Sequence, residues 1–214
     1  MIYDNKINDS IKNIIHSELS DDVKIISKHS DHYKRMKKIN EHEYLIEMDC
    51  DNFDENIWLH ECMHISQLEE RYPQLITNIR SKSIRMLGER LQDFVLDTYL
   101  NNRLFNKYNY KITSTSKYEG YTQQIKNLNK NKANQFFNML MSIEISYIYF
   151  NESEQLAKKL LSQTEKKFSY GVSKLFYKII DIVHKYNDDT PENCKKCFDE
   201  IISLFNLSDF IETT

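Results

Sequence analysis

The chain has 214 residues, with 29 basic and 32 acidic side chains interspersed and a net charge of -3. So balanced a charge gives no field that attracts nucleic acid or an anionic membrane, and we expect neither as a partner. Only 3 Gly and 2 Pro occur, against about 15 and 11 at average usage, which predicts long helices. Residues 1–10 lack the basic start and apolar run of a secretory signal. No stretch approaches the ~20 apolar residues that cross a bilayer, so we expect a cytoplasmic protein.

The N-terminal part of the chain predicts one short helix, two strands and a longer helix. Residues 10–19 place isoleucine and leucine at helical spacing. Residues 23–27 and 43–50 are rich in β-branched and aromatic side chains, and the second stretch alternates with period two, which predicts a small antiparallel sheet. From Asn52 onward apolar residues recur every three or four positions, which predicts a helix, and Pro73 ends or interrupts it.

The remainder of the chain reads as helical. Residues 75–104 predict a buried helical stretch with a break near residues 81–83. Residues 108–120 are polar, with four consecutive Ser or Thr, and mark the clearest boundary. We therefore expect a domain at 1–107, a polar connection at 108–120 and a helical subdomain at 121–214. The helices expected beyond the boundary are 121–128, 131–150, 153–164, 167–185 and 191–204.

The predicted long helix contains the segment His60-Glu61-Cys62-Met63-His64. Two histidines four residues apart project from one helix face, so that both ring nitrogens can reach one metal ion at about 2.0 to 2.1 Å. Glu61 lies about 100° around the helix from His60, where it can approach a metal-bound water rather than the metal. Such a string arises by chance in roughly a few per cent of chains of this composition. Its uncharged neighbours favour a buried metal helix, with zinc as the expected cofactor and Glu61 as general base.

A motif of this kind, between a predicted strand and a further helix, resembles the zincin metallopeptidases over residues 43–104. The resemblance implies an α+β, predominantly α fold: a zincin-like core with a small N-terminal sheet, the metal helix and a following ligand helix, plus a C-terminal helical subdomain. In the metzincin branch a Gly and a third His follow the second His by three and six residues, where this chain has Gln67 and Glu70. The gluzincin-like branch fits better, and implies a third ligand from an acid of the next helix.

Two pairs of acids at four-residue spacing match that arrangement, Glu89 with Asp93 and Asp93 with Asp97. At ~100° per residue each pair lies only ~40° apart. A buried acid needs a cation or a donor, whereas Glu89 beside Arg90 can be solvated. We therefore expect Asp93 as the third ligand and Asp97 as its partner. Other ligand choices remain: Glu89 with Asp93 as its partner, Asp97 itself, or Cys50 in place of the carboxylate, since Cys with two His also binds zinc. A further alternative is that these acids pair with arginines on a helix surface and bind no metal.

Several other residues carry weaker signals. A donor for a developing oxyanion is expected, and Tyr118, Tyr121 and Arg103 are candidates among which the sequence does not choose. Cys194 and Cys197 have the spacing of half a zinc site, yet without a second cysteine pair they read as reduced residues of a helix. The other histidines are expected at the surface: His16, His29, His32, His42 and His184.

The function expected from these residues is zinc-dependent hydrolysis of a peptide or protein, with the helices of 121–214 offering a surface for a protein partner. A hydrolase acting on a non-peptide amide would use the same residues. A different class of protein is the alternative: a non-enzymatic helical interaction or regulatory module that keeps the motif as a structural or vestigial metal site.

Overall fold

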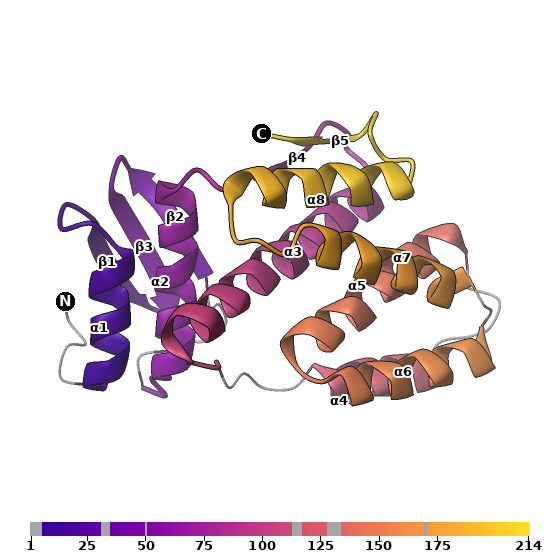
Figure 1. The fold of residues 1–214 in the computed structure, drawn as a ribbon, viewed down its shortest axis with the longest axis horizontal. Coiled ribbons are helices and arrows are strands. Elements are labelled where there is room, and N and C mark those ends of the chain that lie inside the picture. The colour runs from indigo at the N-terminus through magenta and orange to yellow at the C-terminus, as the bar shows by residue number, and fades with distance from the viewer. Residues whose placement is uncertain (1–5, 31–34, 50, 113–116, 128–133, 169–170) are drawn as a thin grey trace. The chain divides into compact units, whose positions relative to one another are not determined.

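The computed structural model describes residues 6–30, 35–49, 51–112, 117–127, 134–168 and 171–214, and it is mostly helical with a small three-stranded sheet (Figure 1). This confirms the coarse fold class that the sequence predicts. The chain divides into two units. The first comprises Met1–Tyr72 and Arg103–Ser114, and the second comprises Pro73–Asn102 and Thr115–Thr214. Helix α3 (Lys82–Tyr108) contributes residues to both.

The first unit contains a mixed sheet of β1 (Lys24–His29), β2 (Arg35–Asn40) and β3 (Glu43–Met48). The strand order is β1-β3-β2, with β3 antiparallel to β2 but parallel to β1. The predicted antiparallel sheet is therefore wrong for the pairing of β1 with β3. The difference arises from β2, a strand that the sequence did not predict. It lies between β1 and β3 in the chain and runs antiparallel to β3, so β1 and β3 run in the same direction.

Strand β2 reads Arg-Met-Lys-Lys-Ile-Asn and forms one edge of the sheet. Charged side chains on an edge strand discourage pairing with other chains. Here they also neutralise Glu47 of β3: Arg35 Nε lies 2.8 Å and Lys37 Nζ 2.9 Å from its carboxylate, and Lys28 Nζ of β1 lies 3.5 Å away. The hydrogen bonds from Arg35 and then Lys37 hold the pKa of Glu47 at about 2. The same charged residues that make residues 35–40 look like a loop in the sequence thus form ion pairs across two strands of the sheet.

Helices α1 (Asp9–Glu18) and α2 (Glu55–Glu69) pack against each other, and α2 also contacts β2. Both helices were predicted, because their apolar residues recur at helical spacing. Burial of these side chains removes apolar surface from water and is the main stabilising contribution to the unit. The buried apolar residues are Ile11, Ile14 and Ile15 of α1, Tyr44, Ile46 and Met48 of β3, and Trp58, Leu59, Cys62, Met63 and Ile65 of α2.

Both ends of α2 are fixed by backbone hydrogen bonds. At its start the Asp54 carboxylate accepts the Asn56 N–H at 2.9 Å, satisfying one of the donors that a helix leaves without an internal partner. At its end Arg71 has φ 62, and the Tyr72 N–H donates to the Gln67 carbonyl at 2.8 Å, the pattern of a left-handed C-cap. Helix α2 therefore presents its side chains from a well-defined backbone.

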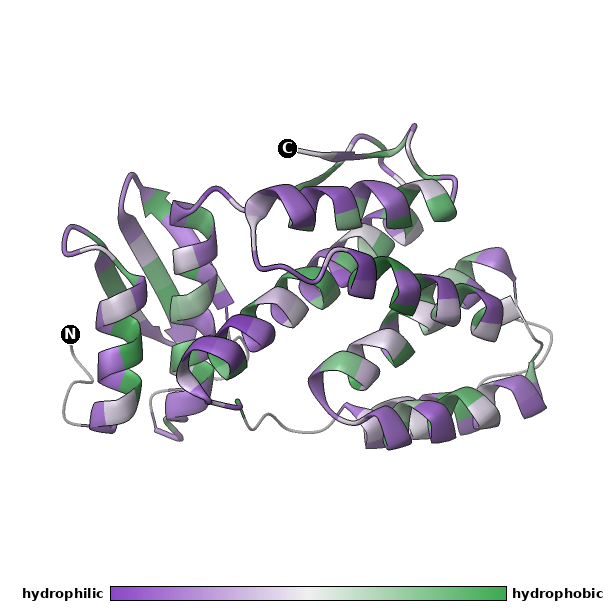
Figure 2. Ribbon diagram, in the orientation of Figure 1, coloured by the Kyte–Doolittle hydropathy of each residue, from purple (hydrophilic) through white to green (hydrophobic). Residues whose placement is uncertain are grey.

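The second unit is built around α5 (Gln135–Asn151), which packs against α6 (Glu154–Lys167) and α7 (Gly171–Lys185). Helix α5 is rich in apolar residues, some of which appear as green bands in Figure 2, and most of its middle is buried. Helix α4 (Tyr118–Asn127) packs on α6, and α8 (Pro191–Leu204) packs on α7. Within the described part of the chain, no helix combines the length and apolarity needed to span a bilayer.

A short two-stranded sheet replaces the start of the helix predicted for residues 75–104. Strand β4 (Leu75–Thr77) pairs antiparallel with β5 (Ile211–Thr213), and α3 begins only at Lys82. The pairing partner lies far along the chain, so local periodicity could not reveal it. A Cβ at Gly88 of α3 would lie 2.9 Å from the Thr77 side chain, so a glycine there lets the strand approach the helix closely.

Candidate functional site

The predicted motif lies in the middle of α2, in the first unit. Helical spacing brings the rings of His60 and His64 together, with 4.5 Å between ring centroids and an interplanar angle of 85°. Their Nε2 atoms lie 3.1 Å apart, and both rings are partly buried. Two zinc ligands at 2.0 to 2.1 Å in a tetrahedral site lie about 3.3 Å apart. The separation of the two nitrogens is therefore close to that of two ligands of one zinc ion. It also fits a hydrogen bond in which one ring donates a proton to the other.

The other ring nitrogen of His64 has a partner that the sequence reasoning missed. His64 Nδ1 lies 3.0 Å from Oε1 of Gln67, whose side chain is almost completely buried. Residues three apart on a helix share a face, so this pairing could have been found from spacing alone. An amide oxygen can only accept, so the contact assigns the Nδ1 proton to His64.

Glu61 is largely buried within α2, at 8% exposure, as expected for an acid on the motif helix. Burial, and then the negative charge of Glu61, raise the pKa of the neighbouring Cys62 thiol. A protonated thiol is neither a good nucleophile nor a ready metal ligand. Among the residues of the motif, the two imidazoles and the Glu61 carboxylate are therefore the candidate ligands and candidate base.

The acids predicted from the next helix belong to the second unit, and the structure distinguishes their surroundings there. The Asp93 side chain is 55% exposed and lies 3.7 Å from Arg90, and Glu89 is exposed as well. Asp97 is buried; burial, followed by the charge of Asp97 and a hydrogen bond with it, raises the pKa of Tyr147. The sequence favoured Asp93 because it was expected to be buried, but in the structure Asp97 is the buried acid. The roles assigned to both acids stay predictions.

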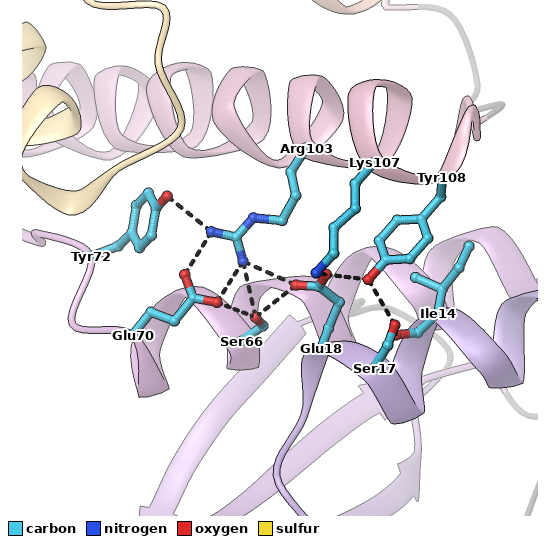
Figure 3. A network of polar contacts seen from close by, with 9 residues as sticks. All are labelled: Ile14, Ser17, Glu18, Ser66, Glu70, Tyr72, Arg103, Lys107 and Tyr108. Atoms are coloured by element: carbon cyan, nitrogen blue, oxygen red, sulfur yellow. Dashed lines mark hydrogen bonds and ion pairs between the residues drawn. The ribbon is translucent and has the colours of Figure 1, made fainter.

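Arg103, one of the three candidate oxyanion donors, is engaged in a buried network of the first unit (Figure 3). Its guanidinium donates to both oxygens of Glu70 at 2.7 and 2.6 Å, to Ser66 Oγ at 3.1 Å, to Glu18 at 3.1 Å and to the Tyr72 hydroxyl at 2.9 Å. Bidentate pairing of this kind is strong and geometrically specific. These contacts give Arg103 a structural role, joining the last turns of α3 to α1 and α2.

Glu18 is the second centre of the same network. Its nearly fully buried side chain accepts from Lys107 Nζ at 2.6 Å and from the Tyr108 hydroxyl, which in turn lies 2.7 Å from Ser17 Oγ (Figure 3). Burial raises the pKa of Glu18, but the hydrogen bonds from Lys107 and Tyr108 and the charge of Arg103 outweigh it, and the pKa is lowered overall. The carboxylate is therefore held in its charged form.

The other two candidate donors lie in the second unit. The Tyr121 hydroxyl donates to the buried Glu144, and Arg90 Nε lies 3.4 Å from the same carboxylate. Tyr118 packs on the core formed by α4 to α7. Because each has contacts that explain its position within its own unit, we assign none of them a catalytic role.

Within the part of the chain that the structure describes, the cysteines and the remaining histidines add no second chemical centre. Cys194 and Cys197 are buried and free on α8, as predicted, and burial raises the pKa of Cys197 to about 12. Cys50 and His32 lie outside the described residues. His29, Asp49 and Asp51 gather their ligand atoms within 4.8 Å.

The position of Asp49 in that last group is explained by the loop itself. Asp49 accepts the backbone N–H groups of Asp51 and Asn52 at 3.0 and 3.1 Å, and the Asn52 side-chain amide at 2.8 Å. A carboxylate that bonds to nearby backbone in this way is a common turn motif. The Asp49 carboxylate therefore needs no ion to account for its position.

Comparison with known proteins adds nothing to this geometry. No protein-family model matches the chain, and no curated protein or solved structure matches it. The resemblance to the zincins stays a prediction, which rests on the segment from His60 to His64. The observation that bears on function is the arrangement of His60, Glu61 and His64 on α2.

Proposed function

We propose that the chain is a zinc-dependent hydrolase that cleaves peptide bonds, with His60 and His64 as metal ligands and Glu61 as general base. One observation carries the proposal: the two Nε2 atoms converge to 3.1 Å on one face of a buried helix. Neutral imidazole nitrogens are common zinc ligands, and their separation fits the tetrahedral value of about 3.3 Å within a few tenths of an ångström.

Glu61 performs the proton chemistry in this proposal. When bound, zinc lowers the pKa of water and polarises a substrate carbonyl. Glu61 takes a proton from the attacking water and later gives it to the leaving amine, so a C–O bond forms and the peptide C–N bond breaks. Its low exposure limits competition from bulk water for the carboxylate oxygens.

A catalytic zinc site commonly has three protein ligands, which leaves one position for water. The third donor is proposed from the sequence alone, as Asp93 with Asp97 as its partner. The Asp93 side chain is 55% exposed and lies 3.7 Å from Arg90, an ion pair that a metal ligand would exchange for the ion. Asp97 is buried and has a hydrogen bond with Tyr147, and it keeps its proposed place as the partner of Asp93.

The proposal is tested by metal removal in a peptide cleavage assay. The zinc-loaded protein is incubated with a mixture of peptides, and new termini are identified by mass spectrometry. We expect cleavage that stops with 1,10-phenanthroline and returns when zinc is added. Absence of cleavage by the zinc-loaded protein, or cleavage indifferent to the chelator, contradicts the proposal. His64→Ala serves as the matched control and should cleave no peptide under any of these conditions.

A further inference from the structure

The buried amide of Gln67 is placed to act on the candidate metal site through His64. Its Oε1 lies 3.0 Å from His64 Nδ1, and the residue is 1% exposed. On the far side of the same ring, His64 Nε2 faces His60 Nε2 at 3.1 Å. The three side chains therefore form one chain of contacts along a single face of α2, which runs from an amide oxygen to the two converging nitrogens.

The direction of these hydrogen bonds follows from the chemistry of the groups. An amide oxygen has no proton to give, so Nδ1 of His64 is the donor. In a neutral imidazole the proton on Nδ1 leaves Nε2 with a free lone pair. Gln67 thereby selects the tautomer in which the nitrogen facing His60 is the one that can bind a metal.

We infer that Gln67 is a positioning residue that holds His64 in its metal-binding tautomer and ring orientation. The inference rests on the proposed function, since it concerns the same metal site. Partners of this kind, which hydrogen-bond to the outer nitrogen of a ligand histidine, fix its orientation and raise its basicity, and their loss commonly lowers metal affinity 10- to 100-fold.

A purely structural role for Gln67 predicts something different. The backbone carbonyl of Gln67 accepts the Tyr72 N–H at 2.8 Å and so helps to end α2. That bond involves no side-chain atom and survives a change of side chain. A structural residue should therefore affect the stability of the metal-free protein, whereas a positioning residue should affect zinc affinity more than that stability.

The test compares Gln67→Met, which keeps the length of the side chain without an acceptor, with Gln67→Glu, which keeps the acceptor. Zinc affinity is measured by competition with a chromophoric chelator, and the melting temperature of each metal-free variant is recorded. We expect Gln67→Met to bind zinc about 10- to 100-fold more weakly with little change in melting temperature, and Gln67→Glu to restore affinity to within a few-fold of the wild type. Gln123→Met, on the exposed face of α4, should bind zinc like the wild type.

Three outcomes contradict the inference. Wild-type affinity in Gln67→Met shows that the amide does not position the ligand. Equal losses in Gln67→Met and Gln67→Glu show that the acceptor oxygen is not what matters. Both results leave the proposed function intact, because the wild type still binds zinc. If the wild type itself binds no zinc, the proposed function fails and the inference fails with it.

Discussion

Replacing Glu61 by Gln should lower peptide hydrolysis by about 10²- to 10⁴-fold, the usual contribution of a general base, while zinc binding stays unchanged. Gln has nearly the same shape as Glu but cannot accept and pass on a proton. Because Glu61 is largely buried on the helix that carries both histidines, an isosteric change is the least disruptive test of its role. The rate is measured with a peptide identified in the cleavage assay.

Glu119→Gln provides the matched control, because Glu119 is an exposed residue of α4 and its change removes the same charge elsewhere. It should keep the wild-type rate. Zinc content is measured on all three proteins, so that loss of metal is not mistaken for loss of a base. A Glu61→Gln variant that retains zinc and hydrolyses the peptide at the wild-type rate would remove Glu61 from the mechanism.

Replacing Arg103 by Ala should lower the free energy of unfolding by about 3 to 5 kcal/mol, the usual cost of removing one partner from a buried ion pair. The variant leaves the Glu18 carboxylate buried with Lys107 as its remaining cation. It also removes the two hydrogen bonds to Glu70. Urea denaturation monitored by circular dichroism measures the change.

Lys196→Ala is the control for this stability measurement. Lys196 pairs with Glu192 at 2.7 Å on α8, and both side chains are at least half exposed. Exposed pairs of this kind contribute about 0 to 1 kcal/mol. A loss below about 1 kcal/mol for Arg103→Ala as well would mean that the network in Figure 3 contributes no more than a surface pair.

Local signals in the sequence were sufficient for the elements whose structure depends on their own residues. Residues 191–204 were predicted as a helix, and α8 has the same bounds, because Thr190 caps its first turn and Pro191 is favoured at the first helical position. The convergence of His60 and His64 follows in the same way from a spacing of four residues.

Features that depend on distant parts of the chain were not accessible from local patterns. Strand β2 is a strand because it pairs with β3, although its composition is that of a solvated loop. β4 likewise needs β5, more than a hundred residues away. Which acid of α3 is buried depends on the helices packed around it, so apolar neighbours in sequence favoured Asp93 whereas the packing buries Asp97.

Metal analysis tests the central claim, that His60 and His64 bind zinc, most directly. Zinc per chain is measured by mass spectrometry on the purified wild type and on the His60→Ala/His64→Ala double variant, after equilibration with zinc and removal of loosely bound ions. Asp93→Asn and Asp97→Asn, measured alongside, assign the third ligand. We expect about one zinc ion per wild-type chain and none in the double variant. A wild type without zinc, or a double variant that retains it, would contradict the account.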